Sequence, residues 1–271
     1  MILMKQERTI TKTGTEIAYN YSGNGNTIIL IHGFLETKEI WDEFEDLLAK
    51  QFSVISIDLP GHGKSGLQEK QYSISDYAQT VKDVMDFEQI KKATLIGHSM
   101  GGYVALAFAD EFHENLSGLC LFHSTPLADS EEKKTMRELT IEKIRNQGTE
   151  QVCKEHAPKV FANENIAKFE DKIQKNIETA LGISAQGVIN SLYAMKNRKD
   201  YSQIFQDIEV PVCYIIGTKD NFIGLDILRN LKFPQNNKTK ILNNSGHIGF
   251  IEEKELALSI ITDFSIHYYS H

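Results

Sequence analysis

Gly97-His98-Ser99-Met100-Gly101-Gly102 is the stretch of this sequence that decides the fold. An apolar run at 93–96 precedes it, and a helix-like run at 103–110 follows it. A Gly-x-Ser-x-Gly motif between a strand and a helix is typical of a nucleophile elbow, a sharp turn that exposes a serine hydroxyl at a sheet edge. Glycines suit this turn, because its backbone is strained and neighbouring segments come close. The motif is short, so the interpretation depends on its surroundings.

Strand-like and helix-like segments alternate along the first half of the chain. Continuous apolar runs are typical of strands in a parallel sheet that is covered on both faces. The predicted strands are 27–31, 52–57, 93–96 and 116–122, and the predicted helices are 36–50, 75–87 and 102–112. The first 22 residues instead predict an antiparallel pair of strands around Thr13-Gly14.

The alternation stops near Ser124, and only helical patterns follow until about Asn197. Their predicted ranges are 130–146, 150–161, 166–181 and 185–197. The α/β pattern then returns with strands at 210–216 and 239–242 and helices at 224–231 and 252–267. The simplest architecture is one α/β core domain, residues 1–125 and 206–271, interrupted by an all-helical insertion, residues 126–205.

Composition narrows the possible partners. The chain has 271 residues, 41% of them hydrophobic, which is enough for a large core. A net charge of −8 would repel a phosphate backbone, so no nucleic-acid partner is expected. The three cysteines are an odd number and form no C-x-x-C pair, which argues against a disulfide framework.

The N-terminus gives no sign of targeting to a membrane or for export. Residues 1–8 contain no basic region followed by a long apolar core, so we expect no signal peptide. No apolar run approaches the roughly 18 residues of a membrane span. We therefore expect a cytoplasmic protein without a membrane partner, and the sequence predicts no oligomeric state.

A nucleophilic serine needs a base, and the base needs a group that orients it. Of the nine histidines, His247 follows the strand 239–242, and the carboxyl ends of parallel strands line one edge of a sheet. Ser99 also follows a strand, so both side chains are expected at that edge. His98 adjoins Ser99, so its side chain is expected to point away from the exposed face of the elbow.

Asp220 is the predicted orienting acid. It follows the strand 210–216 and so belongs to the same edge, whereas Asp226 is further on and is expected to be helical. The loop 123–125 after the preceding strand offers no carboxylate. The chain order Ser99, Asp220, His247 is the order found in hydrolases whose nucleophilic serine sits on such an elbow.

The oxyanion of an acyl-transfer intermediate needs two N–H donors. One is expected from the backbone of Met100, which follows the nucleophile at a helix N-terminus. The other is expected from the loop His32-Gly33-Phe34-Leu35, where Phe34 is our choice.

Two motifs that suggest other chemistry are rejected. Gly61-His62-Gly63-Lys64-Ser65-Gly66 matches G-x-G-x-x-G, but it runs into a polar loop rather than a helix, and Asp58 stands where a P-loop needs glycine. Cys120-x-x-His123 lies at a strand end, where a packed cysteine is the simpler reading, and no H-E-x-x-H occurs. We expect no metal and no cofactor.

As a set, these motifs resemble the α/β-hydrolase superfamily. The matching segments are Ile31-His32-Gly33-Phe34, Asp58 to Ser65, Gly97 to Gly102, Gly217-Thr218-Lys219-Asp220 and Gly246-His247. The resemblance implies an eight-stranded, mostly parallel sheet flanked by helices, with a helical cap after the sixth strand. It also implies Ser99, Asp220 and His247 as catalytic triad, with the N–H groups of Phe34 and Met100 as oxyanion hole. A proline that often follows the acid is replaced here by Ile223-Gly224.

Serine at position 99 argues against haloalkane dehalogenases and epoxide hydrolases, which use aspartate there. Since one fold hosts many reactions, the sequence leaves three hypotheses open. The first is a carboxylesterase-like enzyme acting on a small-molecule ester, the second a C–C bond hydrolase or lyase with the same triad, and the third a ligand-binding receptor with slow turnover.

The substrate pocket is expected to be apolar. Residues beside the catalytic groups should line it, namely Leu35, Phe222, Ile223 and Ile248. The cap should add Leu127, Phe161 and Tyr193, although core packing would explain these three equally well.

Overall fold

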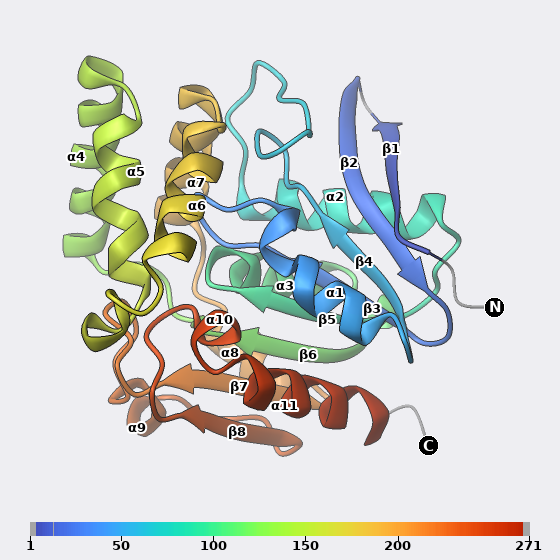
Figure 1. The fold of residues 1–271 in the computed structure, drawn as a ribbon. Coiled ribbons are helices and arrows are strands. Elements are labelled where there is room, and N and C mark those ends of the chain that lie inside the picture. The colour runs from blue at the N-terminus through green and yellow to red at the C-terminus, as the bar shows by residue number, and fades with distance from the viewer. Residues whose placement is uncertain (1–3, 13, 268–271) are drawn as a thin grey trace.

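The computed structural model describes residues 4–12 and 14–267. Two predictions fall partly outside these described residues. One is the turn around Thr13, and the other concerns residues 1–3, where no signal peptide is expected. At the centre is an eight-stranded sheet of order β1-β2-β4-β3-β5-β6-β7-β8 (Figure 1). The strands are β1 (Gln6–Lys12), β2 (Thr15–Gly23), β3 (Thr27–Ile31), β4 (Ser53–Ile57), β5 (Ala93–His98), β6 (Leu116–Phe122), β7 (Val212–Gly217) and β8 (Asn237–Leu242).

The sheet is mostly parallel. Strand β2 pairs antiparallel with β1 and with β4, and the remaining neighbours, from β4 across to β8, are parallel. The predicted fold class, an eight-stranded and mostly parallel sheet flanked by helices, is therefore confirmed. The parallel register places the carboxyl ends of β3, β5, β6, β7 and β8 along one edge.

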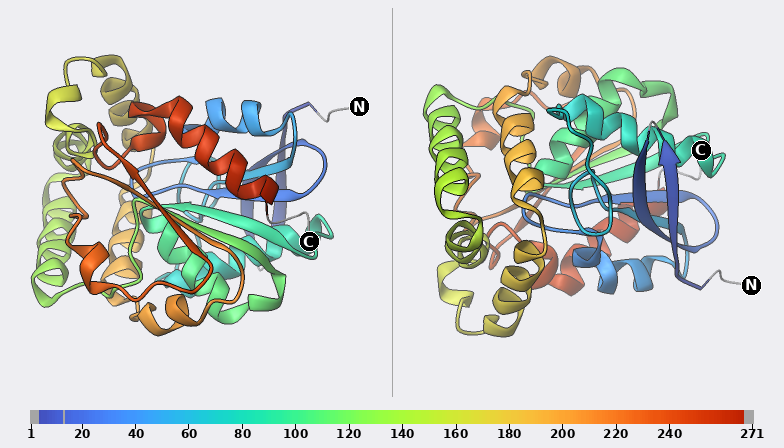
Figure 2. Two further views of the ribbon diagram at one scale, coloured as in Figure 1. Left: turned by 90° about the horizontal axis from the view of Figure 1, so that it is seen from below. Right: turned by 90° about the horizontal axis from the view of Figure 1, so that it is seen from above.

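Two layers of helices cover the sheet, as the views along it show (Figure 2). Helices α1 (Asp42–Leu48) and α11 (Lys254–His267) lie on one face. Helices α2 (Ile74–Phe87), α3 (Met100–Glu111) and α8 (Ser202–Asp207) lie on the other. Each face therefore has its own buried hydrophobic cluster.

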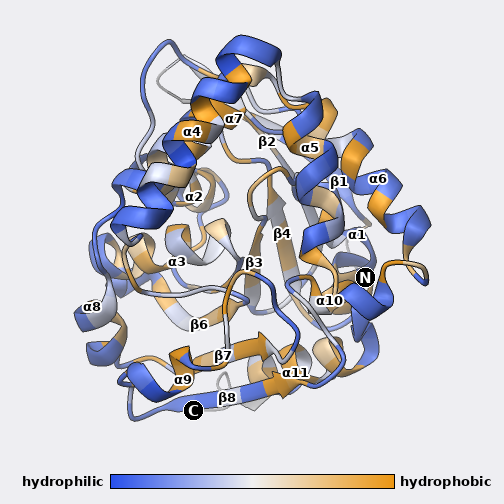
Figure 3. Ribbon diagram, turned by 90° about the vertical axis from the view of Figure 1, so that its left-hand side faces the viewer, coloured by the Kyte–Doolittle hydropathy of each residue, from blue (hydrophilic) through white to orange (hydrophobic). Residues whose placement is uncertain are grey.

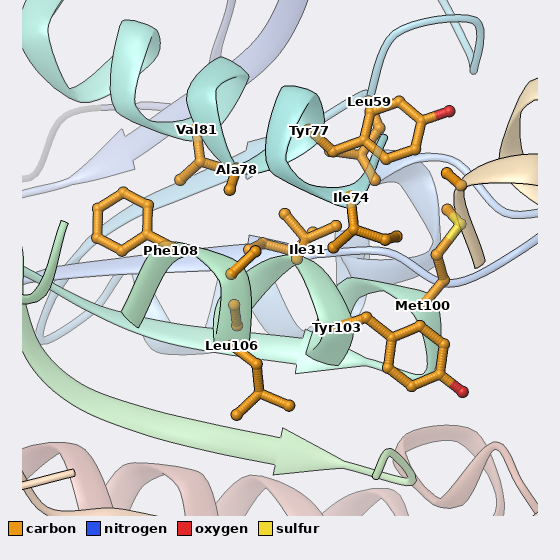
Figure 4. Close-up of a cluster of buried hydrophobic side chains, with 14 of the residues drawn as sticks. Ile31, Leu59, Ile74, Tyr77, Ala78, Val81, Met100, Tyr103, Leu106 and Phe108 are labelled. Carbon is orange, nitrogen blue, oxygen red and sulfur yellow. The ribbon is translucent and has the colours of Figure 1, made fainter. Parts of the chain in front are cut away.

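Strand β3 shows why its apolar run is continuous. Successive side chains of a strand point to opposite faces. Ile29 and Ile31 accordingly belong to the cluster under α2 and α3, and Ile28 and Leu30 belong to the cluster under α1 and α11. In Figure 4, Ile31 lies between the side chains of α2 and those of α3.

A run of helices separates β6 from β7. It contains α4 (Glu131–Gln147), α5 (Glu150–His156), α6 (Glu170–Leu181) and α7 (Ala185–Asn197), which together we call the helical insertion. It stands on the side to which β6 and β7 point (Figure 1). The predicted boundary between residues 205 and 206 falls inside α8, a helix that packs against α3.

Several predicted helices are shorter or split. The predicted helix 150–161 ends at His156, and the 3-10 turn η3 (Ala157–Val160) follows, since Pro158 has no N–H for a longer helix. The helix predicted at 166–181 begins at Glu170. The predicted helix 36–50 divides into η1 (Lys38–Trp41) and α1, and the one at 252–267 divides into α10 (Gly249–Glu252) and α11. The one at 224–231 shortens to α9 (Ile227–Asn230). The 3-10 turns η2 (His113–Asn115), after α3, and η4 (Asn163–Asn165) lie outside the predicted helices. Among the described residues, no helix combines the length and apolarity that crossing a membrane requires.

The glycine-rich turn after β4 packs against the helical insertion. A Cβ atom on Gly187 of α7 would lie 2.3 Å from the carbonyl oxygen of Gly61, so the two backbones are in direct contact. Beside them, Nε2 of His62 lies 3.1 Å from Oγ of Ser191, also on α7. Gly61 and His62 thus have a packing role between the core and α7.

Candidate active site

Ser99 occupies a strained turn between β5 and α3. Its backbone has φ 49° and ψ −112°, in the left-handed half of conformational space that serine rarely adopts. The N–H of Ser99 donates to the carbonyl of Phe122 at 3.0 Å, which ties the turn to the end of β6. A Cβ on Gly97 would lie 2.3 Å from the carbonyl oxygen of Gly101, so the turn is too tight for a side chain there.

The two glycines after Met100 fit the elbow against its neighbours. A Cβ on Gly101 would lie 2.3 Å from the carbonyl oxygen of Ile31, and one on Gly102 would lie 2.2 Å from Oγ of Ser124. That Ser124 hydroxyl donates to the carbonyl of Ser99 at 2.8 Å. The glycines of the motif are thus needed because other segments of the chain pack closely around the serine turn.

Asp220 and His247 meet at the carboxyl edge of the sheet. Nδ1 of His247 lies 2.8 Å from Oδ2 of Asp220. The other carboxylate oxygen of Asp220 accepts the backbone N–H groups of Phe222, at 2.8 Å, and Ile223, at 3.0 Å. Asp226, the competing acid, is exposed and precedes α9.

A second histidine reaches the same carboxylate. Nδ1 of His123, directly after β6, lies 3.2 Å from Oδ2 of Asp220, and both side chains are buried. Nε2 of His123 accepts the N–H of Gly249 at 3.1 Å, so the proton belongs on Nδ1, which donates to Asp220. The longer 3.3 Å approach of the Gly217 N–H to that same Nδ1 is then not a hydrogen bond.

These contacts keep Asp220 ionised. Burial alone would raise the pKa of Asp220, but the charge of His247 and the hydrogen bonds from His123 and His247 lower it far below the ordinary value. Burial lowers the pKa of His123 to about 4, so this imidazole is neutral at pH 7. The neutral imidazole of His123 and the candidate base His247 therefore share one carboxylate oxygen.

His98, which the sequence analysis did not choose as the base, is buried and connects the loop of Glu36 with the loop of His247. Its Nδ1 lies 2.9 Å from Oε2 of Glu36, and its Nε2 lies 2.8 Å from the carbonyl oxygen of His247. Since both partners only accept, His98 donates from both nitrogens as an imidazolium. Burial would lower the pKa of His98, but Glu36 raises it overall. Glu36 also accepts the N–H of Gly33 at 2.6 Å, in the loop that precedes Phe34.

The sequence did not identify His123, Glu36 or the link through His98 as parts of the site. His123 had one usable signal, since it directly follows a strand at the edge that carries Ser99 and Asp220. Glu36 had none, because its partner His98 lies 62 residues away in the chain.

The predicted oxyanion donors lie on two loops beside the elbow. Met100 begins α3, and its side chain is fully buried. Phe34 follows the strand β3, and the next residue, Leu35, has φ 60°. The role of their N–H groups stays a prediction.

Ser99 and His247 line one cavity of about 390 Å³ between the core and the helical insertion. Phe34, Phe222 and Ile223 line it as well. Apolar residues of the insertion complete this part of the wall, namely Met136, Val152, Leu192 and Met195, together with Val160 of η3.

The other residues predicted for the pocket lie elsewhere. Leu35 lines a neighbouring cavity of about 380 Å³. Phe161 and Ile248 are fully buried in the cluster under α1 and α11. Leu127 is partly exposed outside the lining, and Tyr193 packs on the other cluster with its hydroxyl accepting from Arg145. Core packing accounts for Phe161, Ile248 and Tyr193.

His123, Asp220 and His247 are also the described residues with suitable spacing for a metal ion, since their ligand atoms lie within 4.8 Å of one another. Each of these atoms is already used in the hydrogen bonds given above. The hydrogen bonds among these three side chains therefore account for their close spacing.

Two proteins with similar sequences show how far the similarity extends along this chain. An uncharacterised protein of Mycobacterium tuberculosis is 37% identical over 111 residues, which are 41% of this chain and 33% of that protein, so the match spans a third of its length. The 2-hydroxy-6-oxononadienedioate/2-hydroxy-6-oxononatrienedioate hydrolase of Paraburkholderia phymatum is 28% identical over 278 residues, covering 94% of this chain and 93% of the relative.

Among solved structures, a thermophilic esterase from Thermogutta terrifontis is 25% identical and has a TM-score of 0.92, with 98% of this chain and 100% of the esterase covered. The family model described as alpha/beta hydrolase fold matches residues 26–254. With the sheet order and the strained turn at Ser99, this match shows that the chain belongs to the α/β-hydrolase family.

Proposed function

We propose that the protein is a serine hydrolase that cleaves small to medium carboxylic esters through an acyl-enzyme on Ser99. One observation carries the proposal. Ser99 and His247 line the same cavity, and Asp220 holds Nδ1 of His247 at 2.8 Å. These observations support His247 as the base that takes the hydroxyl proton of Ser99, and Asp220 as the acid that keeps this base in the right tautomer.

In the proposed reaction, Oγ of Ser99 attacks the ester carbonyl while Nε2 of His247 takes the hydroxyl proton. The N–H groups of Met100 and Phe34 stabilise the resulting oxyanion. The proton on His247 then passes to the leaving alcohol, and the acyl group stays on Ser99. Water attacks the acyl-enzyme with His247 again as base, which releases the carboxylic acid.

The size and lining of the cavity support small to medium substrates. A volume of about 390 Å³ lies near the lower end of ligand pockets, which span roughly 300–1,000 Å³. Phe34, Phe222 and Ile223 offer an apolar surface next to the nucleophile. The Thermogutta terrifontis esterase, with a TM-score of 0.92, adds support for ester substrates.

A C–C bond hydrolase with the same triad is the second candidate. The observation that favours it is the relative from Paraburkholderia phymatum, which aligns over 94% of this chain. In that case Ser99 and His247 would serve the cleavage of a carbon–carbon bond beside a ketone.

The test is hydrolysis of p-nitrophenyl esters from acetate to dodecanoate by wild type and by Ser99→Ala. We expect turnover of short chains by the wild type and a loss of about 10⁴-fold or more in kcat for the variant. Matching thermal melts of the two proteins would show that the variant is folded. Activity retained by Ser99→Ala would overturn the mechanism.

A wild type that turns over no ester but reacts with a fluorophosphonate probe would overturn the ester proposal and leave a competent nucleophile. Vinylogous 1,5-diketones would then test the second candidate. Slow single turnover, with a large ligand-induced rise in melting temperature, would instead favour a receptor.

A further inference from the structure

One face of helix α4 lines the catalytic cavity and carries mostly cations. Its cavity-lining residues are Lys133, Met136, Arg137, Thr140 and Lys143, which follow the spacing of one helical face. The helix as a whole is hydrophilic (Figure 3). None of its four glutamates belongs to the residues that line this cavity.

The lining as a whole has more positive than negative groups. Lys159 of η3 joins Lys133, Arg137 and Lys143, against the carboxylates of Glu36 and Glu155. The charge of Glu36 is already matched by the buried His98. This surplus of cations stands in a chain whose formal net charge is −8.

Glu155 compensates only part of this surplus. It accepts hydrogen bonds from Gln151 and Lys143, and these contacts, with nearby Lys159, lower the pKa of its carboxyl group. Lys133 and Lys159 are exposed, and within the described part of the chain no carboxylate forms an ion pair with either ammonium group.

Arg137 is held in place by a carboxylate that it shares with a second arginine, so its positive charge is only partly compensated. It donates from Nε to the buried carboxylate of Asp129, which also forms an ion pair with Arg198 at 2.8 Å. Two guanidinium groups thus share one carboxylate. Arg198 is fixed further by lying 3.9 Å from the ring centroid of Tyr103, another residue of the cavity wall.

The cavity therefore has two unlike walls. The core wall presents Ser99 with Phe34 and Phe222, and the α4 wall presents Lys133 and Arg137. A neutral ester would offer no anionic partner to Lys133 or to the remaining guanidinium donors of Arg137. An ester with a carboxylate would place its carbonyl at Ser99 and pair its charge with these cations through charge-assisted hydrogen bonds.

We propose that the substrate carries a carboxylate on the part that lies against α4, so that the enzyme prefers anionic esters to neutral esters of equal length. This inference rests on the proposed function of Ser99. The carboxylate has two possible places, on the acyl part or on the alcohol part, and the chemistry of recognition is the same for both.

The first test compares two matched pairs of esters by titration of the acid released. Methyl hydrogen adipate against methyl hexanoate places the charge on the acyl part, and 4-acetoxybutanoate against butyl acetate places it on the alcohol part. We expect kcat/KM to be about tenfold higher for the anionic member of one pair at low salt, and the preference to shrink as sodium chloride is added. Equal or better hydrolysis of both neutral members would overturn the proposal.

The second test uses Lys133→Gln, Lys159→Gln and the double variant. We expect KM for the preferred anionic ester to rise about fivefold or more in the double variant, with the neutral ester unaffected. Lys134→Gln is the matched control, because Lys134 is on the same helix, pairs with Glu131 and does not line the cavity. An equal effect of Lys134→Gln would mean that any positive charge on α4 attracts the anionic ester through the general electrostatic field, without a binding site in the cavity. That result would overturn the proposal.

Failure of the proposed function has a separate signature. If the wild type hydrolyses neither pair, calorimetric binding of methyl hydrogen adipate, 4-acetoxybutanoate and their neutral partners to Ser99→Ala still tests recognition of the charge. Tighter binding of an anionic ester, lost in the double lysine variant, would support an anion-binding cavity without esterase chemistry. No preference in binding would overturn the inference itself.

Discussion

Nδ1 of His98 lies 2.9 Å from Oε2 of Glu36, and both side chains are buried. The other nitrogen of His98 bonds the carbonyl of His247, and Glu36 bonds the N–H of Gly33. One buried ion pair therefore connects the loop of His247, the proposed general base, with the loop that precedes Phe34. Gly33 leaves room for it, since a Cβ there would lie 2.8 Å from Nδ1 of His98.

Glu36→Gln should lower the stability of the protein in a way that depends on pH. The pKa of Glu36 is lowered in the fold, where burial would raise it but His98 outweighs burial, so its contribution is present above its ordinary pKa of 4.5 and is lost as pH falls through the folded pKa. The pKa of His98 is raised, so its contribution is fully present below 6.5 and is lost as pH rises through the folded pKa. The stabilising contributions of Glu36 and His98 are therefore both present between pH 4.5 and pH 6.5.

We expect Glu36→Gln to cost about 1–3 kcal/mol in the free energy of unfolding at pH 5.5, and less at pH 9. Urea unfolding of both proteins across this range measures the difference. Glu39→Gln, at an exposed neighbouring position, is the control and should change little. A cost that grows steadily from pH 5.5 to pH 9 would contradict the ion pair.

Asp220→Asn should reduce kcat for ester hydrolysis by about 10⁴-fold, because the amide no longer holds the productive tautomer of His247. Steady-state kinetics on the best p-nitrophenyl ester measure the loss. Asp226→Asn should leave kcat nearly unchanged, since this exposed residue does not contact His247. A larger loss for Asp226→Asn would mean that the acid has been misassigned.

His123→Phe should reduce kcat by about tenfold with little change in KM, because Asp220 loses one of two imidazole donors but keeps its backbone donors. The acid limb of the pH–kcat profile should also move to higher pH, since a carboxylate that loses one donor keeps more of its negative charge to stabilise the protonated form of its remaining imidazole partner. His113→Phe, at an exposed histidine of η2, serves as the control. A purely structural role would lower the melting temperature and leave the pH profile in place.

Gly102→Ala should destabilise the elbow although alanine favours helices by about 1 kcal/mol over glycine. The added Cβ would lie 2.2 Å from Oγ of Ser124, which bonds the carbonyl of Ser99. We expect a net cost of about 1–3 kcal/mol in thermal or urea unfolding, together with reduced kcat.

Ser124→Gly in the same chain should recover part of the stability, because it removes the atoms that collide with the new methyl group. Gly66→Ala is a matched glycine substitution, since its Cβ would have no neighbour closer than 3.6 Å. Full stability of Gly102→Ala alone would show that the elbow tolerates a wider approach than the structure implies.

The sequence predicted the sheet and the edge that carries Ser99, Asp220 and His247, because continuous apolar runs mark buried parallel strands and their ends share one edge. The strand ranges 27–31 and 116–122 are those that the structure contains. Contacts between distant residues, such as Glu36 with His98 and His123 with Asp220, depend on how loops meet in space and leave no periodic pattern.

The pocket was the least predictable part. Its prediction relied on apolar residues such as Phe161 and Tyr193, whereas α4 contributes Lys133, Arg137 and Lys143. A helix rich in charged residues shows no apolar stripe from which its inner face could be read. Only the rotation of α4 in the fold decides which of its side chains meet the cavity.

The helical insertion leaves the core after Phe122 of β6 and the chain re-enters at Val212 of β7, and these two strands are neighbours in the sheet. The points where the chain leaves the core and returns to it therefore lie next to each other on neighbouring strands of the sheet. Transplanting a different insertion would need two splice points side by side and would leave Ser99, Asp220 and His247 on their own strands. Under the proposed function, substrate selectivity is therefore open to engineering through the insertion, separately from the residues proposed to react.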